Sequence, residues 1–266
     1  MSGFETVRYE AREGIAAITL ARPDKRNAVN REMFVEIAEA AEQAGSDPDV
    51  HGVILAGEGQ SFCAGIDLGL LAEFGTLAAL PGSQFRSFVK MAQRPYRVLA
   101  RLEKPTLAAV QGHALGAGFQ LALACDLRVL ATNAHLALLE TRYGIIPDLG
   151  GMHALTRIVG AGRAKEIVWT ARRVEAEEAD RIGLANRVVD ERKLMDEAET
   201  LLREVLAHSP VAVAQSKSLI DHADETPLEV EFDREAQAQT TCVQSEDHQE
   251  AVAAFFEKRS PRFKGR

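Results

Sequence analysis

One carboxylate in the sequence has surroundings that suit proton transfer. Glu140 follows the apolar run 136–139 and precedes Arg142. A carboxylate held partly out of water has a raised pKa, as a general base for carbon acids requires. Considered alone, a solvated Glu140 or one paired with Arg142 is the simpler interpretation. Asp148 precedes Leu149 and two glycines, a pattern that favours a helix N-cap over a catalyst.

Two loops of small residues could stabilise a developing negative charge. Segment 111–120 carries three glycines between an expected buried strand and an expected buried helix, and segment 61–68 has a similar character. Backbone N–H groups from two such loops could point at one oxygen, the geometry that stabilises a thioester enolate. The alternative is that the glycines only allow close packing of strand and helix. A dinucleotide site is excluded because its third glycine would fall on Leu121.

Cys63 lies in the second of these loops and could suggest a nucleophile. It has no evident activating base, and apolar neighbours would raise the pKa of its thiol. We therefore expect a structural role for Cys63.

The composition excludes several classes of protein. The chain has 266 residues, 46% hydrophobic and 26% charged, which is enough apolar material for a sizeable core. Its net charge of −8 provides no global positive field for a nucleic acid or an anionic bilayer, so neither is expected as a partner. The three cysteines lack metal-type spacing, and residues 1–14 contain no apolar signal segment. We expect a cytoplasmic protein without a metal site.

The remaining pattern predicts an α/β core followed by helices. A hairpin is expected over 6–21, and strands are expected at 51–56, 106–111 and 127–131. Helices are expected at 30–43, near Asp67, at 83–102 and at 119–125, and this alternation favours stacked β-β-α units. From residue 191 onward only helical patterns occur, at 192–207, 210–222, 227–241 and 247–258. We predict a core over 1–195 and a helical region over 196–266.

Several of these segments, taken together, resemble the crotonase, or enoyl-CoA hydratase/isomerase, superfamily. The resemblance covers nearly the whole chain, and the order and spacing of the segments make it specific. The matching segments are 22–28, 62–68, 111–118, 125–126, 146–151 and 256–259.

The resemblance implies a spiral of β-β-α units with a C-terminal helical trimerisation region, in homotrimers or hexamers. It implies a fatty acyl-CoA thioester substrate, with coenzyme A as part of the substrate and no tightly bound cofactor. The family's oxyanion hole maps to the backbone N–H groups of Ile66 and Ala117. Its coenzyme A contacts map to Lys25, Arg26, Ala28, Ala64, Gly65, Asp67 and Leu68, with Phe263 and Lys264 in the tail.

One departure from the family pattern bears on mechanism. The family's hydratases use two glutamates around one water, and these positions correspond to Gln120 and Glu140. Because Gln120 cannot exchange a proton near neutral pH, we expect double-bond isomerisation with Glu140 as the base. Asp148 corresponds to an acid of the family's dienoyl-CoA isomerases and could share the work. Two alternatives remain, a hydratase or a non-catalytic protein that binds acyl-CoA or RNA.

Overall fold

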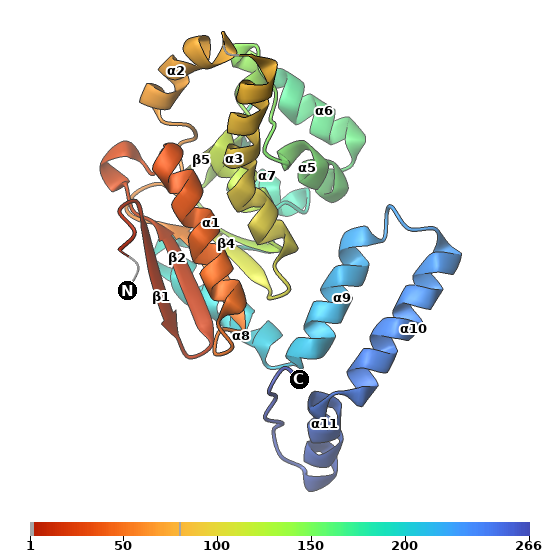
Figure 1. Ribbon diagram of the computed structural model, residues 1–266. Helices are drawn as coiled ribbons and strands as arrows, with labels where there is room; N and C mark the ends of the chain where they lie inside the picture. The colour runs from red at the N-terminus through yellow and green to blue at the C-terminus, as the bar shows by residue number, and fades with distance from the viewer. Residues whose placement is uncertain (1–2, 80) are drawn as a thin grey trace. The chain divides into compact units, whose positions relative to one another are not determined.

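The computed structural model describes residues 3–79 and 81–266 (Figure 1). Contacts divide the chain into two compact units. The first comprises the residues up to Leu102 and Thr106–Glu199, and the second comprises Glu103–Pro105 and Thr200–Arg266. The division after Glu199 lies close to the predicted boundary after residue 195.

The first unit contains a six-stranded sheet in the order β1-β2-β3-β4-β6-β9. Its strands are β1 (Val7–Arg12), β2 (Ile15–Leu20), β3 (Gly52–Gly57), β4 (Thr106–Val110), β6 (Leu127–Ala131) and β9 (Arg187–Val189). β1 and β2 form the predicted antiparallel hairpin, and every other neighbouring pair is parallel. β3 and β4 are almost continuously apolar because both faces of a parallel sheet are covered.

A second, smaller sheet positions the functional residues. It pairs β5 (His113–Leu115) in parallel with β7 (His135–Ala137), and β7 antiparallel with β8 (Val174–Glu175). Isolated parallel bridges join Cys63 to Ala114 and Ile66 to Val29, which extends this layer. Segment 62–66, β5 and β7 therefore run side by side in one direction, and their carboxyl ends meet at one edge.

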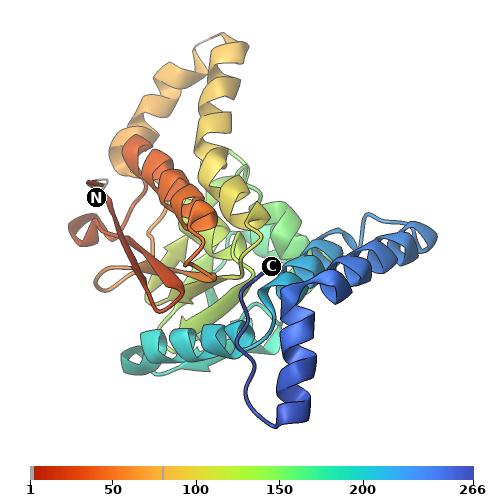
Figure 2. The same cartoon turned by 60° about the horizontal axis from the view of Figure 1, so that its bottom comes forward.

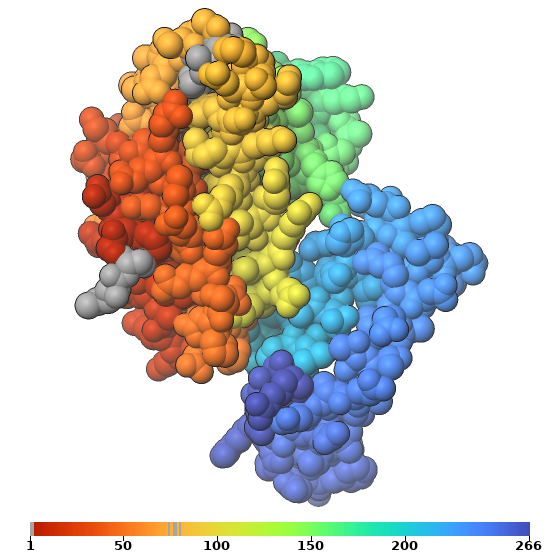
Figure 3. Space-filling view, in the orientation of Figure 1, coloured from red at the N-terminus to blue at the C-terminus, as the bar shows by residue number. Residues whose placement is uncertain are grey.

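Helices cover the sheets of the first unit. They are α1 (Arg31–Ser46), α2 (Leu68–Ala78), α3 (Gly82–Arg101), α4 (Ala117–Leu123), α5 (Gly151–Val159), α6 (Ala161–Thr170) and α7 (Ala176–Arg181), while α8 (Leu194–Leu206) crosses the division. α1 begins at Asn30, whose side chain accepts from the Met33 N–H as an N-cap. α1 and α3 lie side by side (Figures 1 and 2), and Figure 3 shows them as orange and yellow ridges on one face.

One prediction near α5 is wrong, and two helices there were not predicted. The sequence pattern did not predict α5 or α6 as separate helices, and Asp148 is not an N-cap. Gly150 caps α5 instead, in the left-handed region with φ +92°, and no side chain provides the cap hydrogen bond. Asp148 is thereby free for another role.

The second unit contains helices and no strand among its described residues, and the chain after α11 forms an extended tail. α9 (Pro210–His222), α10 (Leu228–Gln244) and α11 (Glu246–Glu257) occupy the predicted helical segments. The α/β architecture with C-terminal helices is confirmed. In the part of the chain that the structure describes, no helix combines the length and apolarity needed to cross a bilayer.

Candidate active site

Three catalytic candidates lie near the carboxyl ends of three parallel segments. Ile66 ends segment 62–66, Ala117 begins α4 directly after β5, and Glu140 begins a 3-10 helix (Glu140–Tyr143) shortly after β7. Together with Gln120 and Asp148 they line one cavity of about 430 Å³. The structure thus brings together all five residues predicted to act in catalysis.

Backbone geometry leaves two N–H groups free at this cavity. In the bridge between Val29 and Ile66, the Val29 N–H donates to Gly65 and the Asp67 N–H donates to Val29, so the Ile66 N–H is not used. The Ala117 N–H belongs to the first turn of α4, where helices leave donors unsatisfied. Among the described residues, neither N–H has an acceptor.

Gly118 brings these two loops into contact. A Cβ atom at this position would lie 2.3 Å from the Cys63 carbonyl oxygen, so only glycine lets α4 approach segment 62–66 this closely. Close packing, the alternative considered for the glycine-rich segment, is therefore correct for Gly118. This close packing is compatible with the free N–H groups of Ile66 and Ala117.

Glu140 is half-buried in the cavity wall. Its Oε1 accepts from the Gln120 amide nitrogen at 2.8 Å, and its Oε2 is buried with no hydrogen-bond partner. Desolvation by burial raises the pKa of Glu140, and the nearby Asp148 adds repulsion. Pairing with Arg142 is wrong as an interpretation, because that guanidinium donates to the Ala171 carbonyl oxygen at 3.3 Å.

Asp148 is the second carboxylate of the cavity. Its side chain stays accessible to solvent, while the surrounding protein raises its pKa by desolvation. Because the side chain is accessible, water screens that effect. The Gln93 amide donates to the Asp148 carbonyl oxygen at 2.6 Å and holds the loop in place.

Cys63 has the structural role that the sequence predicts. The residue is fully buried, and burial raises the pKa of its thiol to about 12. A thiol with that pKa is not a nucleophile near neutral pH.

The apolar wall contributed by α3 was not predicted from the sequence. This wall consists of Phe85, Phe88, Val89 and Ala92. Their i, i+3, i+4, i+7 spacing was visible in the sequence as a stripe on one helical face. Farther along α3, the buried Tyr96 hydroxyl donates to the Ala117 carbonyl oxygen at 3.1 Å.

A second cavity of about 390 Å³ lies against the first. Gln120 and Leu149 line both cavities and form the partition between them. The second cavity is otherwise lined by Gln93, Tyr96, Arg97, Ala100, Leu123, Ala124, Gly150, His153 and Ala154.

The segments predicted to bind coenzyme A contact each other. The Ala64 N–H donates to the Arg26 carbonyl oxygen at 2.9 Å, and Arg22 forms an ion pair of 3.0 Å with Asp67. The side chains of Lys25 and Arg26 are exposed, and Leu68 is 80% exposed. Ala28 and Gly65 lie in the same pair of segments.

Asn27 organises these segments and was not singled out from the sequence. It is completely buried, and its amide bonds the Arg22 N–H and the carbonyl oxygens of Glu58 and Ser61 at 2.7 to 2.9 Å. Only its place inside the segment 22–28 signalled this role.

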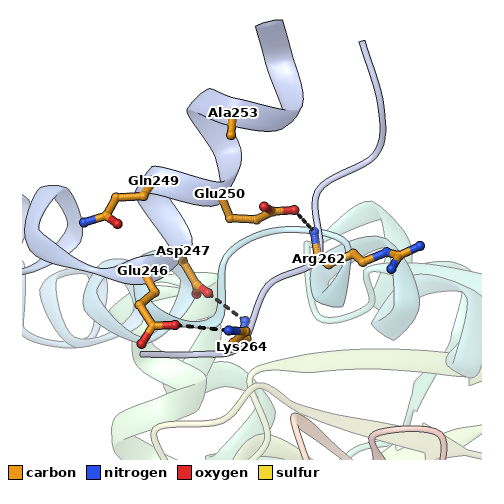
Figure 4. A pocket seen from close by; sticks show the side chains of 7 residues that line it. All are labelled: Glu246, Asp247, Gln249, Glu250, Ala253, Arg262 and Lys264. Atoms are coloured by element: carbon orange, nitrogen blue, oxygen red, sulfur yellow. Dashed lines mark hydrogen bonds and ion pairs between the residues drawn. The ribbon is translucent and has the colours of Figure 1, made fainter. Parts of the chain in front are cut away.

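Phe263 and Lys264 belong to the second unit. Figure 4 shows the Lys264 ammonium paired with Glu246 at 3.3 Å and the Lys264 N–H donating to Asp247 at 2.7 Å. Arg259 is likewise paired, with Glu250 and Glu257. Much of the tail's positive charge is therefore balanced within its own unit, and a contact of Phe263 or Lys264 with coenzyme A stays a prediction. Among residues 3–79 and 81–266, no cluster of potential metal ligands is found.

Comparison with known proteins identifies the family of the chain. A family model described as enoyl-CoA hydratase/isomerase matches residues 10–266. A crotonyl-CoA hydratase of Syntrophomonas wolfei is 35% identical over 98% of both chains. A 1,2-epoxyphenylacetyl-CoA isomerase of Escherichia coli is 33% identical over 98% of this chain and 99% of its own.

A solved structure shows the same fold. It is an enoyl-CoA hydratase from Bacillus anthracis, with a TM-score of 0.90 and 33% identity, over 98% of this chain and all of the other. The arrangement of sheets and helices is thus that of the crotonase fold. The chain belongs to the enoyl-CoA hydratase/isomerase family, as the sequence segments predicted.

The perturbed Glu140 predicts a pH-dependent difference in stability. Because its pKa is higher in the folded than in the unfolded chain, the folded state favours the neutral form. Wild-type stability should therefore fall as the pH rises from the unfolded value, about 4.3, through the folded value. Glu140→Gln removes this loss and should be the more stable protein at pH 8. The difference should vanish below pH 4, as measured by urea denaturation.

The control is Glu39→Gln, which removes an equal charge from an exposed position of α1. Equal stability of Glu140→Gln and wild type at every pH would mean that the carboxylate is not desolvated.

Proposed function

We propose that the protein is an acyl-CoA isomerase that moves a double bond from the 3 to the 2 position of a fatty acyl thioester. The observation that carries this proposal is the pairing of one ionisable side chain, Glu140, with one amide, Gln120, at the cavity wall. A proton shift needs one carboxylate, whereas syn-hydration needs an acid and a base around one water.

In the proposed reaction, Glu140 Oε2 removes a proton from C2 of the thioester. The electron pair of the C–H bond moves toward the carbonyl and gives an enolate conjugated with the double bond. The N–H groups of Ile66 and Ala117 donate to the enolate oxygen. Glu140 then returns the proton to C4, the double bond forms between C2 and C3, and the carboxylate is regenerated.

The apolar wall supports the same chemistry. Phe34, Phe88 and Ile146 line the cavity, and such surroundings strengthen hydrogen bonds to a developing anion because water is excluded. They also suit an uncharged fatty acyl chain.

Hydration of a 2-enoyl-CoA is the second candidate. The names of several relatives favour it, and Asp148 provides a second carboxylate in the cavity that could replace the missing acid. A non-catalytic protein that binds acyl-CoA or RNA is disfavoured by the retained Glu140 and the net charge of −8.

Coenzyme A binding is proposed at segments 22–28 and 64–68. The exposed Lys25 and Arg26 offer charge for the phosphates, and the backbone around Ala64 and Gly65 offers a surface for the adenine. The Arg22–Asp67 ion pair holds the segments together, and coenzyme A enters as part of the substrate.

The double variant Lys25→Ala and Arg26→Ala should weaken coenzyme A binding. The loss is Coulombic, so it should be largest at low salt and shrink as the ionic strength rises. Isothermal titration calorimetry at several salt concentrations measures it. Arg163→Ala and Lys165→Ala, an equal charge change on α6, is the control. A dissociation constant that stays at the wild-type value in low salt would remove this site.

Glu140→Gln and Asp148→Asn should separate the two candidate reactions. With a 3-enoyl-CoA, Glu140→Gln should lower kcat by roughly 10²-fold or more, the usual contribution of a positioned base. Asp148→Asn should lower it by less than about tenfold, because the solvent-accessible Asp148 only assists. A panel of 2-enoyl-, 3-enoyl- and dienoyl-CoA thioesters provides the measurement. Strong hydration that survives Glu140→Gln would reject the isomerase.

A homotrimer, alone or paired into a hexamer, is proposed as the assembly. Large apolar side chains remain exposed on the helices and require a covering partner. They include Ile220, Leu228, Phe232, Phe255 and Phe256. Light scattering at micromolar concentration should give three or six chain masses, and a monomer would contradict the proposal.

A further inference from the structure

Gln120 has a fixed amide orientation. Its side chain is 1% exposed, and its Oε1 accepts from the N–H groups of Leu149 at 2.9 Å and Gly151 at 3.2 Å. Backbone N–H groups can only donate, so the amide oxygen must face them. The amide nitrogen must then point the other way, toward Glu140.

The packing around Gln120 keeps this orientation. A Cβ atom at Gly151 would lie 2.4 Å from Gln120 Cγ, so the start of α5 presses directly on the side chain. A side chain held between α4 and the start of α5 has little freedom to choose another rotamer. The hydrogen bond to Glu140 is therefore built into the packing of the two helices.

The contact distinguishes the two oxygens of Glu140. Oε1 is engaged by the Gln120 amide at 2.8 Å, whereas Oε2 is buried without a partner. A buried oxygen without a hydrogen-bond partner destabilises the fold, and a catalytic role is one explanation for its presence. Only Oε2 retains full capacity to accept a new proton.

We propose that Gln120 is a positioning residue that holds Glu140 by one oxygen and leaves the other as the base that attacks the acyl-CoA. The inference rests on the proposed function, in which Glu140 removes the C2 proton. It assigns a role to the side chain that replaces the first glutamate of the family's hydratases. In this arrangement Gln120 positions Glu140 and does not itself transfer a proton.

The electrostatics around Glu140 predict the direction in which its pKa changes when Gln120 is replaced. Burial raises the pKa of Glu140, whereas N–H donors favour the ionised carboxylate and lower it. The donors are the Glu140 backbone N–H, the Gln120 amide and the Leu139 backbone N–H. The other titratable groups coupled to this site are Asp148, which repels the anion, and the buried Tyr96 and Cys63. Without the Gln120 amide, Glu140 should therefore ionise only at a higher pH.

The direct contact also determines the expected effect of Gln120→Glu. The restored second carboxylate would suit hydration if a water lay between the two side chains. Here the groups touch at 2.8 Å, so two carboxylates would share one proton. We expect Gln120→Glu to raise the apparent pKa of the base and not to create an efficient hydratase.

The test uses solvent exchange of the C2 protons of butyryl-CoA in D₂O, followed by NMR over a range of pH. This substrate has no double bond, so the readout depends on proton removal and not on isomerisation or hydration. Gln120→Leu should slow exchange by roughly tenfold or more, since a misplaced base loses its alignment. The acidic limb of its pH profile should move to higher pH.

Gln111→Leu is the matched control. Gln111 is also buried, and its amide donates to the carbonyl oxygens of Gly57 and Gly59 at 2.6 and 2.9 Å. Its loss should reduce stability without moving the acidic limb. Gln120→Glu provides a second test if Gln120→Leu does not fold, because it keeps the acceptor for Leu149 and Gly151.

The outcomes separate the inference from the proposed function. If Gln120→Leu or Gln120→Glu exchanges protons at the wild-type rate and the acidic limb of its pH profile does not move, the positioning role is wrong. The proposed function would still stand. An equal movement of the acidic limb in Gln111→Leu would also overturn the positioning role, because the loss of any buried amide would then have the same effect. No exchange by the wild type, together with no isomerisation of a 3-enoyl-CoA, would overturn both.

Discussion

The parallel alignment of segment 62–66, β5 and β7 is the constraint on which the candidate site depends. Backbone hydrogen bonds fix the spacing of the three segments, for example from Leu115 to Cys63 at 3.0 Å and from Gly116 to Ala137 at 2.7 Å. The groups at their carboxyl ends therefore have defined positions before any substrate arrives. Donors held in this way need little reorganisation when charge develops, which is the main advantage of a backbone oxyanion hole.

The electrostatics of Glu140 depend on this alignment of the three segments. Burial makes the Glu140 anion less stable and so a stronger base, while the Gln120 amide keeps that anion accessible. The two effects oppose each other, and their balance sets the pH at which the carboxylate can accept a proton. An apolar wall from α3 lowers the local polarity and so strengthens both effects.

The sequence predicted the long elements well and the short ones poorly. α1, α3 and the helices α9 to α11 have enough turns for their apolar periodicity to be unambiguous. β5, β7 and β8 have only two or three residues each, too few for any period, yet they form the sheet that carries the site.

The site residues show the same division between local and distant information. The raised pKa of Glu140 was predictable because the preceding residues are apolar. The amide orientation of Gln120 was not, because it depends on Leu149 and Gly151, which lie 29 and 31 positions away along the chain. Asp148 was misjudged for a related reason, since a glycine in the left-handed region can begin a helix without a capping side chain.

Under the proposed function, the partition between the two cavities links the chemistry to the size of the acyl group. Gln120 and Leu149 separate the cavity of about 430 Å³ from its neighbour of about 390 Å³. A smaller residue at position 120 would open the partition and lengthen the space for an acyl chain, but it would also release Glu140. Under the proposed function, position 120 therefore affects both the room for the acyl group and the support of the base.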